Sequence, residues 1–165
     1  MSGERKLKPE DRKIAILSEL IVILGEASKK SYDQGVKTMQ SKADVDGPWQ
    51  SKQPDEMIKI ELQAGWYNKR GKDFKKSKEE VEDLLEREQN GENGGTGSVL
   101  IWEMKDPEHE GPIEETVVIT PSGGGEIGSF RLLSEEAPLA KLVRGKLAGQ
   151  KVDFGEISVT IKEII

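Results

Sequence analysis

Apolar residues recur at helical spacing through roughly the first half of the chain. One stripe follows Pro9, a residue type that favours the first turn of a helix, and comprises Ile14, Leu17, Ile21, Leu24, Tyr32, Val36, Met39 and Ala43. A second stripe advances in alternating steps of three and four residues and comprises Met57, Ile60, Ala64, Tyr67, Gly71, Phe74, Lys78, Val81 and Leu85. Because such spacing lines one face of a helix, the pattern predicts two long helices with facing seams.

A sharp break separates the two predicted helices. Residues 44–54 contain Gly47-Pro48 and Pro54, and a helix does not continue through proline. Each helix spans about 30 residues, or about 45 Å at 1.5 Å per residue. Two helices of similar length around a short break favour an antiparallel coiled-coil hairpin over residues 1–90, with an acidic tip at residues 44–56.

The start of the first helix is apolar on a second side as well, through Ile16, Leu20 and Ile23. A two-helix coil cannot bury that side, so we expect it to pack on the C-terminal half of the chain. Four glycines also fall inside the helices, each at a cost of about 1 kcal/mol relative to alanine; they are Gly25, Gly35, Gly65 and Gly71.

The pattern changes after residue 90. Residues 91–96 are rich in glycine and predict a linker. Beyond them, short β-branched runs predict strands at 98–104, 115–120, 126–133, 151–154 and 157–164, with a short helix at 139–144. The sequence therefore predicts an α+β protein, in which residues 97–165 form a small antiparallel sheet domain with one helix.

Composition removes several kinds of chemistry. The chain has 165 residues, a net charge of −6, no cysteine and one histidine, His109. Disulfides, thiol nucleophiles and multi-histidine metal sites are therefore excluded. With a single histidine, most arrangements of a Ser-His-Asp catalytic triad are excluded as well. No apolar run approaches the roughly 20 residues of a membrane span, and no signal-peptide core follows Met1. We expect a cytoplasmic protein whose chemistry, if any, depends on carboxylates.

Carboxylates gather at the bend between the helices. Asp44 and Asp46 precede it, and Asp55 and Glu56 follow it. Carboxylates are hard oxygen ligands that suit Mg²⁺, and a long hairpin delivers such ligands to a distant site on a partner. The alternative is structural, because acids also cap helices and Asp-Gly-Pro is ordinary turn sequence. Trp49 lies at the same bend and either contacts a partner or folds back on the coil.

The second helix also carries a basic strip opposed only by Asp73. The strip consists of Lys69, Arg70, Lys72, Lys75 and Lys76, with Lys78 beside it. A basic surface behind an acidic tip could contact RNA or phosphate. A solvated helix face is the alternative explanation of the same residues.

The C-terminal half contains a recognisable motif. Residues 133–146 read Leu-Ser-Glu-Glu-Ala-Pro-Leu-Ala-Lys-Leu-Val-Arg-Gly-Lys and resemble the Ser-Pro-Leu-x-x-x-Leu-Leu-Gly-Lys signature of the GreA/GreB transcript cleavage factors. Residues 149–152, Gly-Gln-Lys-Val, are similar to the Gly-Asp-x-Val that follows in that family. Over residues 97–165 the resemblance rests on the motif and the order of the predicted strands. Over residues 10–88 it rests only on the predicted helical hairpin.

This resemblance implies a coiled-coil hairpin followed by an FKBP-like domain, and bacterial RNA polymerase as the partner. The C-terminal domain would dock at the secondary channel near Ala137, Pro138 and Leu139, and the hairpin would enter it. Asp44 and Asp46 would then help hold a Mg²⁺ ion shared with the polymerase, which hydrolyses backtracked RNA. The resemblance implies an accessory factor rather than an enzyme, without a tightly bound cofactor and in transient contact with nascent RNA. We also expect a monomer that contacts no membrane.

The tip differs from the family pattern. Gre factors carry Asp-Leu/Tyr-Ser-Glu-Asn, whereas this chain reads Asp-Val-Asp-Gly-Pro-Trp over residues 44–49. Two functions other than cleavage stimulation are therefore also considered. One is a Gre-like inhibitor, similar to Rnk, that binds polymerase without cleavage. The other is a prolyl isomerase with a helical arm, for which Trp102, Phe130 and Phe154 would supply the aromatic pocket.

Overall fold

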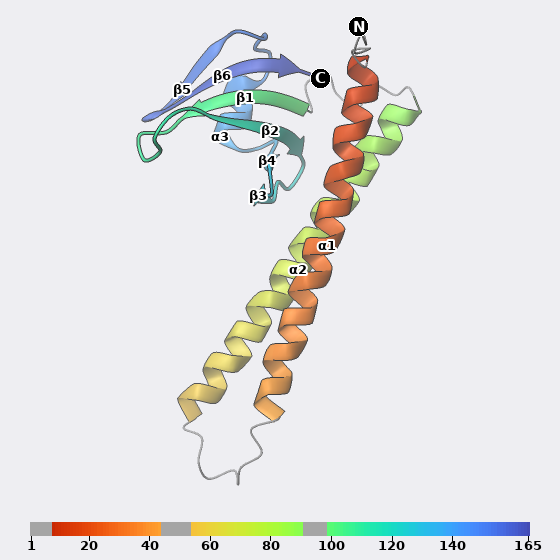
Figure 1. The fold of residues 1–165 in the computed structure, drawn as a ribbon, viewed down its shortest axis with the longest axis vertical. Coiled ribbons are helices and arrows are strands. Elements are labelled where there is room, and N and C mark those ends of the chain that lie inside the picture. The colour runs from red at the N-terminus through yellow and green to blue at the C-terminus, as the bar shows by residue number, and fades with distance from the viewer. Residues whose placement is uncertain (1–7, 44–53, 91–98) are drawn as a thin grey trace, which may run out of the picture.

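The computed structural model describes residues 8–43, 54–90 and 99–165 and shows an α+β fold. Two long helices, α1 (Pro9–Ala43) and α2 (Pro54–Gln89), lie side by side, and a six-stranded sheet packs against one half of their length (Figure 1). The helices run antiparallel, since Lys13 near the start of α1 pairs with Glu88 near the end of α2 at 2.8 Å. The predicted helical hairpin is confirmed.

The seam of α2 follows the sequence prediction. All nine of its members are buried or half-buried, from Met57 to Leu85. At mid-hairpin the two backbones approach closely. The hydroxyl of Ser28 donates a hydrogen bond to the carbonyl oxygen of Gly71 at 2.9 Å, and a Cβ atom at Gly71 would lie 3.1 Å from the ring of Tyr32. Glycine at this position therefore makes room for the tyrosine ring.

The distal part of the α1 seam differs from the prediction. Val36 and Met39 are 54% and 43% exposed. The buried positions are instead Ser28, Ser31 and Gly35, all small residues. Small side chains let α1 approach α2, and the larger Tyr32 ring fits there because Gly71 faces it. The apolar stripe was therefore wrong at Val36 and Met39, whereas Tyr32 is half-buried as predicted. The stripe counted hydrophobicity and not size.

The sheet contains β1 (Val99–Lys105), β2 (Ile113–Thr120), β3 (Gly125–Ile127), β4 (Phe130–Ser134), β5 (Lys151–Phe154) and β6 (Ile157–Ile164) in the order β3-β4-β2-β1-β6-β5. Helix α3 (Pro138–Val143) lies between β4 and β5 in sequence. The prediction of a wholly antiparallel sheet is wrong, because β2 and β4 pair in parallel. The single strand predicted at 126–133 is in fact two strands, β3 and β4, which reverse at Gly128 with φ +59°.

Each face of the sheet has its own core. On the hairpin side, Leu20 is fully buried in one cluster with residues such as Val99, Val118 and Leu132, and Ile16 and Ile23 pack against that cluster. On the α3 side, Trp102 is fully buried in a second cluster with Val143. The expectation that the second apolar side of the first helix packs on the C-terminal half is confirmed.

Polar contacts fix the sheet to the hairpin at defined points. Ser77 donates a hydrogen bond to the carbonyl oxygen of Gly123 at 3.0 Å, and the carboxylate of Glu80 accepts one from the backbone N–H of Ser122 at 3.1 Å. Arg12 forms an ion pair with Glu163. These contacts all involve the half of the hairpin remote from Ala43 and Pro54, so the other half projects beyond the sheet (Figure 1). No helix in the described ranges is long and apolar enough to cross a membrane.

Candidate functional site: the projecting half of the hairpin

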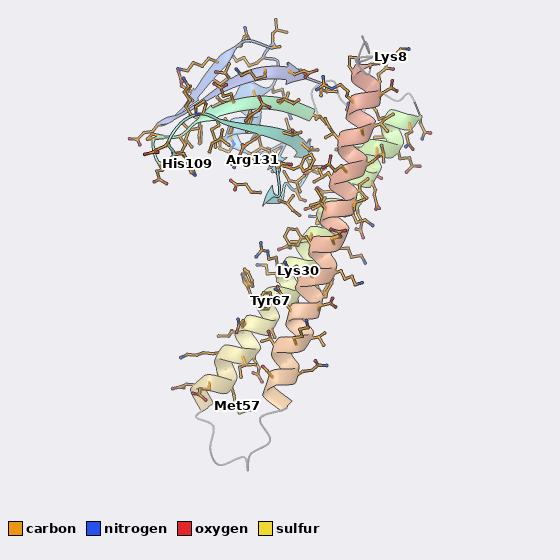
Figure 2. All side chains as sticks on the ribbon, in the orientation of Figure 1. Lys8, Lys30, Met57, Tyr67, His109 and Arg131 are labelled. Atoms are coloured by element: carbon orange, nitrogen blue, oxygen red, sulfur yellow. The ribbon has the colours of Figure 1, made fainter. Side chains whose placement is uncertain are left out.

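The tip of the hairpin is framed by the ends of α1 and α2. Asp44, Asp46 and Trp49 lie outside the described residues. Asp55 and Glu56 occupy the first turn of α2 and are exposed. Carboxylates there favour the helix, because the N-terminus of a helix carries partial positive charge. Figure 2 shows the nearby Met57 at the end of the hairpin farthest from the sheet, so Asp55 and Glu56 lie at that extremity.

The length of the projecting part follows from the helix geometry. Ser77 and Glu80 are the α2 residues whose side chains hydrogen-bond the turn after β2. From Ser77 back to Pro54, α2 extends for about 35 Å at 1.5 Å per residue. The described ends of the two helices, Ala43 and Pro54, therefore lie well away from the domain that bears the Gre-like motif.

The predicted basic strip lies on this projecting part. Its five members Lys69, Arg70, Lys72, Lys75 and Lys76 are all exposed. Lys75 and Lys76 approach Glu79 and Glu80 only at 3.9 and 4.0 Å, distances at which exposed pairs contribute little. Lys69 and Lys72 form no ion pair within the described ranges.

Arg70 has a separate role within the strip. Its guanidinium group lies 5.1 Å from the ring centroid of Trp66 and 5.4 Å from that of Phe74. Phe74 is buried in the core that joins hairpin and sheet, whereas Trp66 is 52% exposed. The arginine side chain therefore contacts both a buried and an exposed aromatic ring of α2.

Helix α1 adds basic residues that the sequence analysis missed. Lys29, Lys30 and Lys37 are exposed on α1, and Figure 2 shows Lys30 at the level of Tyr67 on α2. Together, segments 29–37 and 69–76 carry eight basic and two acidic residues in a chain of net charge −6. The register of the hairpin, in which Ser28 faces Gly71, is the information needed to join the two segments.

The Gre-like motif surrounds α3. Ala137 precedes the helix as its N-cap, and Pro138 opens it. Pro138 is exposed, but Leu139 is half-buried and packs against the α3-side core. Leu142 and Leu147 present exposed apolar side chains in the same region. A partner that docks on this region would thus meet Leu142 and Leu147 more fully than Leu139.

An ion-pair network occupies the α3-side face of the sheet beyond α3. Arg131 donates from Nε and Nη2 to the carboxylate of Glu115, both at 2.8 Å, and from Nη2 to Glu126 at 2.6 Å. The indole N–H of Trp102 donates to Glu115 at 2.9 Å. Burial opposes the charged form of Glu115, but these hydrogen bonds and the Arg131 charge outweigh it and lower its pKa.

This network borders an open depression of about 430 Å³ that is also lined by His109 and Phe130. Glu115 keeps Arg131 charged and raises the pKa of the guanidinium, so both partners are held in fully ionised form. Groups that satisfy each other in this way stabilise the sheet and leave neither free to transfer a proton. His109 is exposed and lies 3.6 Å from Asp106.

The three aromatic residues named for a prolyl isomerase do not come together. Trp102 is buried in the α3-side core, and Phe130 is buried in the core on the hairpin side. Phe154 is 40% exposed on β5, at the opposite edge of the sheet from β3. Their placement on different faces gives no aromatic pocket for a proline ring.

Carboxylates in the described part of the chain form no cluster of three or more that could hold a metal ion. The predicted metal ligands, Asp44 and Asp46, lie outside that part. Comparison of the whole chain with known protein families, with curated proteins and with solved structures finds no match.

Proposed function

We propose that this chain is an accessory transcription elongation factor that binds bacterial RNA polymerase at its secondary channel and brings an acidic hairpin tip to the active site, where it stimulates cleavage of backtracked RNA. The observation that carries the proposal is the projecting half of the hairpin, about 35 Å of paired helices beyond the sheet. The Gre-like motif at residues 133–146 supplies the identity of the partner.

The geometry suits delivery of a ligand over a distance. A channel-entering arm must be narrow and stiff, and two helices packed through small residues at Ser28, Ser31 and Gly35 meet both needs. The arm must also keep a fixed direction from the docking domain. The hydrogen bond from Ser77 to Gly123 and the shared core around Leu20 hold that direction.

The tip residues fit the donor chemistry of Mg²⁺. Asp44 and Asp46 supply carboxylate oxygens, and Mg²⁺ in proteins is commonly held by one or two carboxylates together with substrate phosphates. Bound there, the ion would activate water and stabilise charge on the phosphate undergoing hydrolysis. The part of this chain is to position the two carboxylates, while the remaining ligands belong to the polymerase.

The basic residues behind the tip suit a transient contact with nascent RNA. Lys69 and Lys72 on α2 and Lys29 and Lys30 on α1 are exposed on the projecting half. Contacts to phosphates are sequence-independent and weaken steeply with salt. The docking surface near Ala137, Pro138 and Leu139, extended by exposed Leu142, would hold the sheet domain at the channel rim.

A Gre-like inhibitor is the second candidate, favoured by one observation. Residues 46–48 read Asp-Gly-Pro, where the cleavage factors carry Ser-Glu-Asn near the tip. A tip without the second family acid would occupy the channel and exclude substrates without adding a working ligand. The prolyl isomerase alternative predicts turnover of a proline peptide, and absence of turnover eliminates it.

The deciding experiment measures RNA cleavage in stalled, backtracked polymerase complexes. Wild-type protein should accelerate cleavage, and the D44A/D46A double variant should lose the acceleration while it binds polymerase with unchanged affinity. The control is D83A/D153A, which removes two exposed carboxylates elsewhere and should behave as wild type. Binding without stimulation, together with inhibition of run-off transcription, would support the inhibitor. Absence of binding would contradict both candidates.

A further inference from the structure

The outer face of α2 carries an apolar row that no other described element covers. Ile58, Leu62 and Trp66 are 53%, 69% and 52% exposed. Their spacing of four residues places them along a single ridge of the helix. This ridge lies on the projecting half of the hairpin, short of Phe74, which joins the core shared with the sheet, and of Ser77, which hydrogen-bonds the turn after β2.

Charged residues flank the row with opposite signs. Asp55 precedes Ile58 by three residues, and Lys69 follows Trp66 by three. Both are exposed, and neither forms an ion pair with another residue of the described segments. Along one face of α2 the order is therefore acid, three apolar residues, base, in steps of three, four, four and three.

The five positions are spaced symmetrically about Leu62, and the charges at the two ends have opposite signs. If a second α2 lies antiparallel on the first with Leu62 at the centre, Ile58 of one copy meets Trp66 of the other. Asp55 then faces Lys69 at both ends. The charged positions are about 10 Å along the helix from the centre, where an extended lysine side chain can still reach a carboxylate of the partner.

We propose that the outer face of α2, formed by Asp55, Ile58, Leu62, Trp66 and Lys69, pairs with the same face of a second copy of this chain in a two-fold symmetric, antiparallel contact. Such an isologous contact requires a self-complementary surface, and both the apolar row and the charges meet that requirement. This inference goes beyond the proposed function and does not depend on it. It differs from the expectation of a monomer.

The size of the face sets the strength of the contact. Three half-exposed side chains and their neighbours bury on the order of several hundred Å² per copy, less than the roughly 800 Å² per partner of a standard interface. The pairing is therefore weak and reversible, with a Kd between about 1 µM and 1 mM. A dimer of this kind also covers the part of the arm that the proposed function would insert into a channel.

Cysteine cross-linking tests the contact directly, because the chain has no cysteine of its own. In an antiparallel contact centred on residue 62, the L62C variant has its two thiols facing each other, and copper–phenanthroline oxidation should link it at least tenfold faster than I58C or V22C. I58C lies in the same row but faces Trp66 of the partner. Val22 is equally exposed at 59%, but on α1. Equal rates for the three variants would overturn the proposal.

Sedimentation over a concentration series provides the second measurement. The mean mass of wild type should rise with concentration, and L62E should remove the rise while V22E retains it. K69D should weaken association about tenfold by placing two acids together, and D55K/K69D should restore it because the exchanged charges again pair across the two-fold axis. A wild type that stays monomeric to about 1 mM, or a double variant no better than K69D, would overturn the proposal.

Discussion

The hydroxyl of Ser77 on α2 donates a hydrogen bond to the carbonyl oxygen of Gly123, 3.0 Å away in the turn after β2. Both residues are buried. The apolar core around Leu20 supplies most of the attraction between hairpin and sheet, but burial of apolar surface has little directional preference. A hydrogen bond requires a defined distance and angle, so this contact helps to fix the direction of the arm relative to the sheet.

Replacement of Ser77 by alanine should therefore destabilise the protein and loosen the attachment. The S77A variant leaves a buried carbonyl group without this donor and should lower the free energy of unfolding by about 1 kcal/mol. Urea denaturation measures the loss. Ser41 is the matched control, since its exposed hydroxyl bonds within α1 to Thr38, and S41A should change stability by less than about 0.5 kcal/mol. Equal effects would contradict this role for Ser77.

Gly123 itself has two reasons to be glycine. Its φ is +72°, and a Cβ atom would lie 2.7 Å from the backbone nitrogen of Ser134. The G123A variant should lose about 2–3 kcal/mol, because left-handed strain and the steric clash add. Gly125 separates the two causes, since its φ is +78° with no atom within 4 Å of a Cβ. G125A should lose only the strain part, about 1 kcal/mol, and an equal loss would contradict the clash.

Two glycines of α2 should respond to alanine with different results. A Cβ atom at Gly65 would have no neighbour within 4 Å, whereas one at Gly71 would lie 3.1 Å from the Tyr32 ring. G65A should raise the free energy of unfolding by about 1 kcal/mol through helix propensity alone. G71A gains the same propensity, but the crowded ring should remove the benefit. Thermal unfolding of both variants checks the difference, and equal stabilisation would show that the Tyr32 ring moves freely.

The Glu115–Arg131 pair makes stability depend on acid pH. Because the pKa of Glu115 is lower in the folded state than its ordinary value of 4.5, the folded state favours the carboxylate. This stabilisation is complete above about pH 4.5 and is lost as the pH falls through the lower folded-state pKa. E115Q should cost about 1–3 kcal/mol at pH 7 and should flatten the acid side of the stability curve. E114Q, at the exposed neighbouring position, should do neither.

The long helices could be predicted from the sequence because helical periodicity is a local property that continues over many residues. The α2 seam shows this, since every predicted member is at least half-buried. The α1 seam shows the limit. Val36 and Met39 fit the apolar period but are exposed, because the contact at mid-hairpin selects small residues. Size at a helix contact depends on the partner helix, which the period of one helix does not reveal.

Strand pairing was harder to predict from the sequence, because it also depends on residues outside the strand itself. The run from Glu126 to Leu133 was predicted as one strand, yet the chain reverses at Gly128, where φ is +59°. After that reversal β4 pairs in parallel with β2, a non-local outcome that the pattern of one strand does not reveal. For the candidate site, the sequence located the basic strip on α2 but not its continuation at Lys29 and Lys30. Joining them requires the register of the hairpin.

The length of the projecting arm provides the last prediction. Removal of residues 36–42 from α1 and residues 58–64 from α2 deletes one heptad from each helix, which nearly preserves the facing of the seams. The arm becomes shorter by about 10 Å, while the tip sequence and the sheet domain stay intact.

If the arm delivers the tip to a fixed site, this shortened variant should bind polymerase as wild type does and lose its effect on cleavage or inhibition, whichever wild type shows. A reach of 10 Å cannot be recovered by side-chain movement, because the arm is two packed helices and its base is fixed at Ser77. The D44A/D46A variant is the comparison, since it keeps the length and removes the acids. A shortened variant with full activity would show that the projecting length has no part in the function.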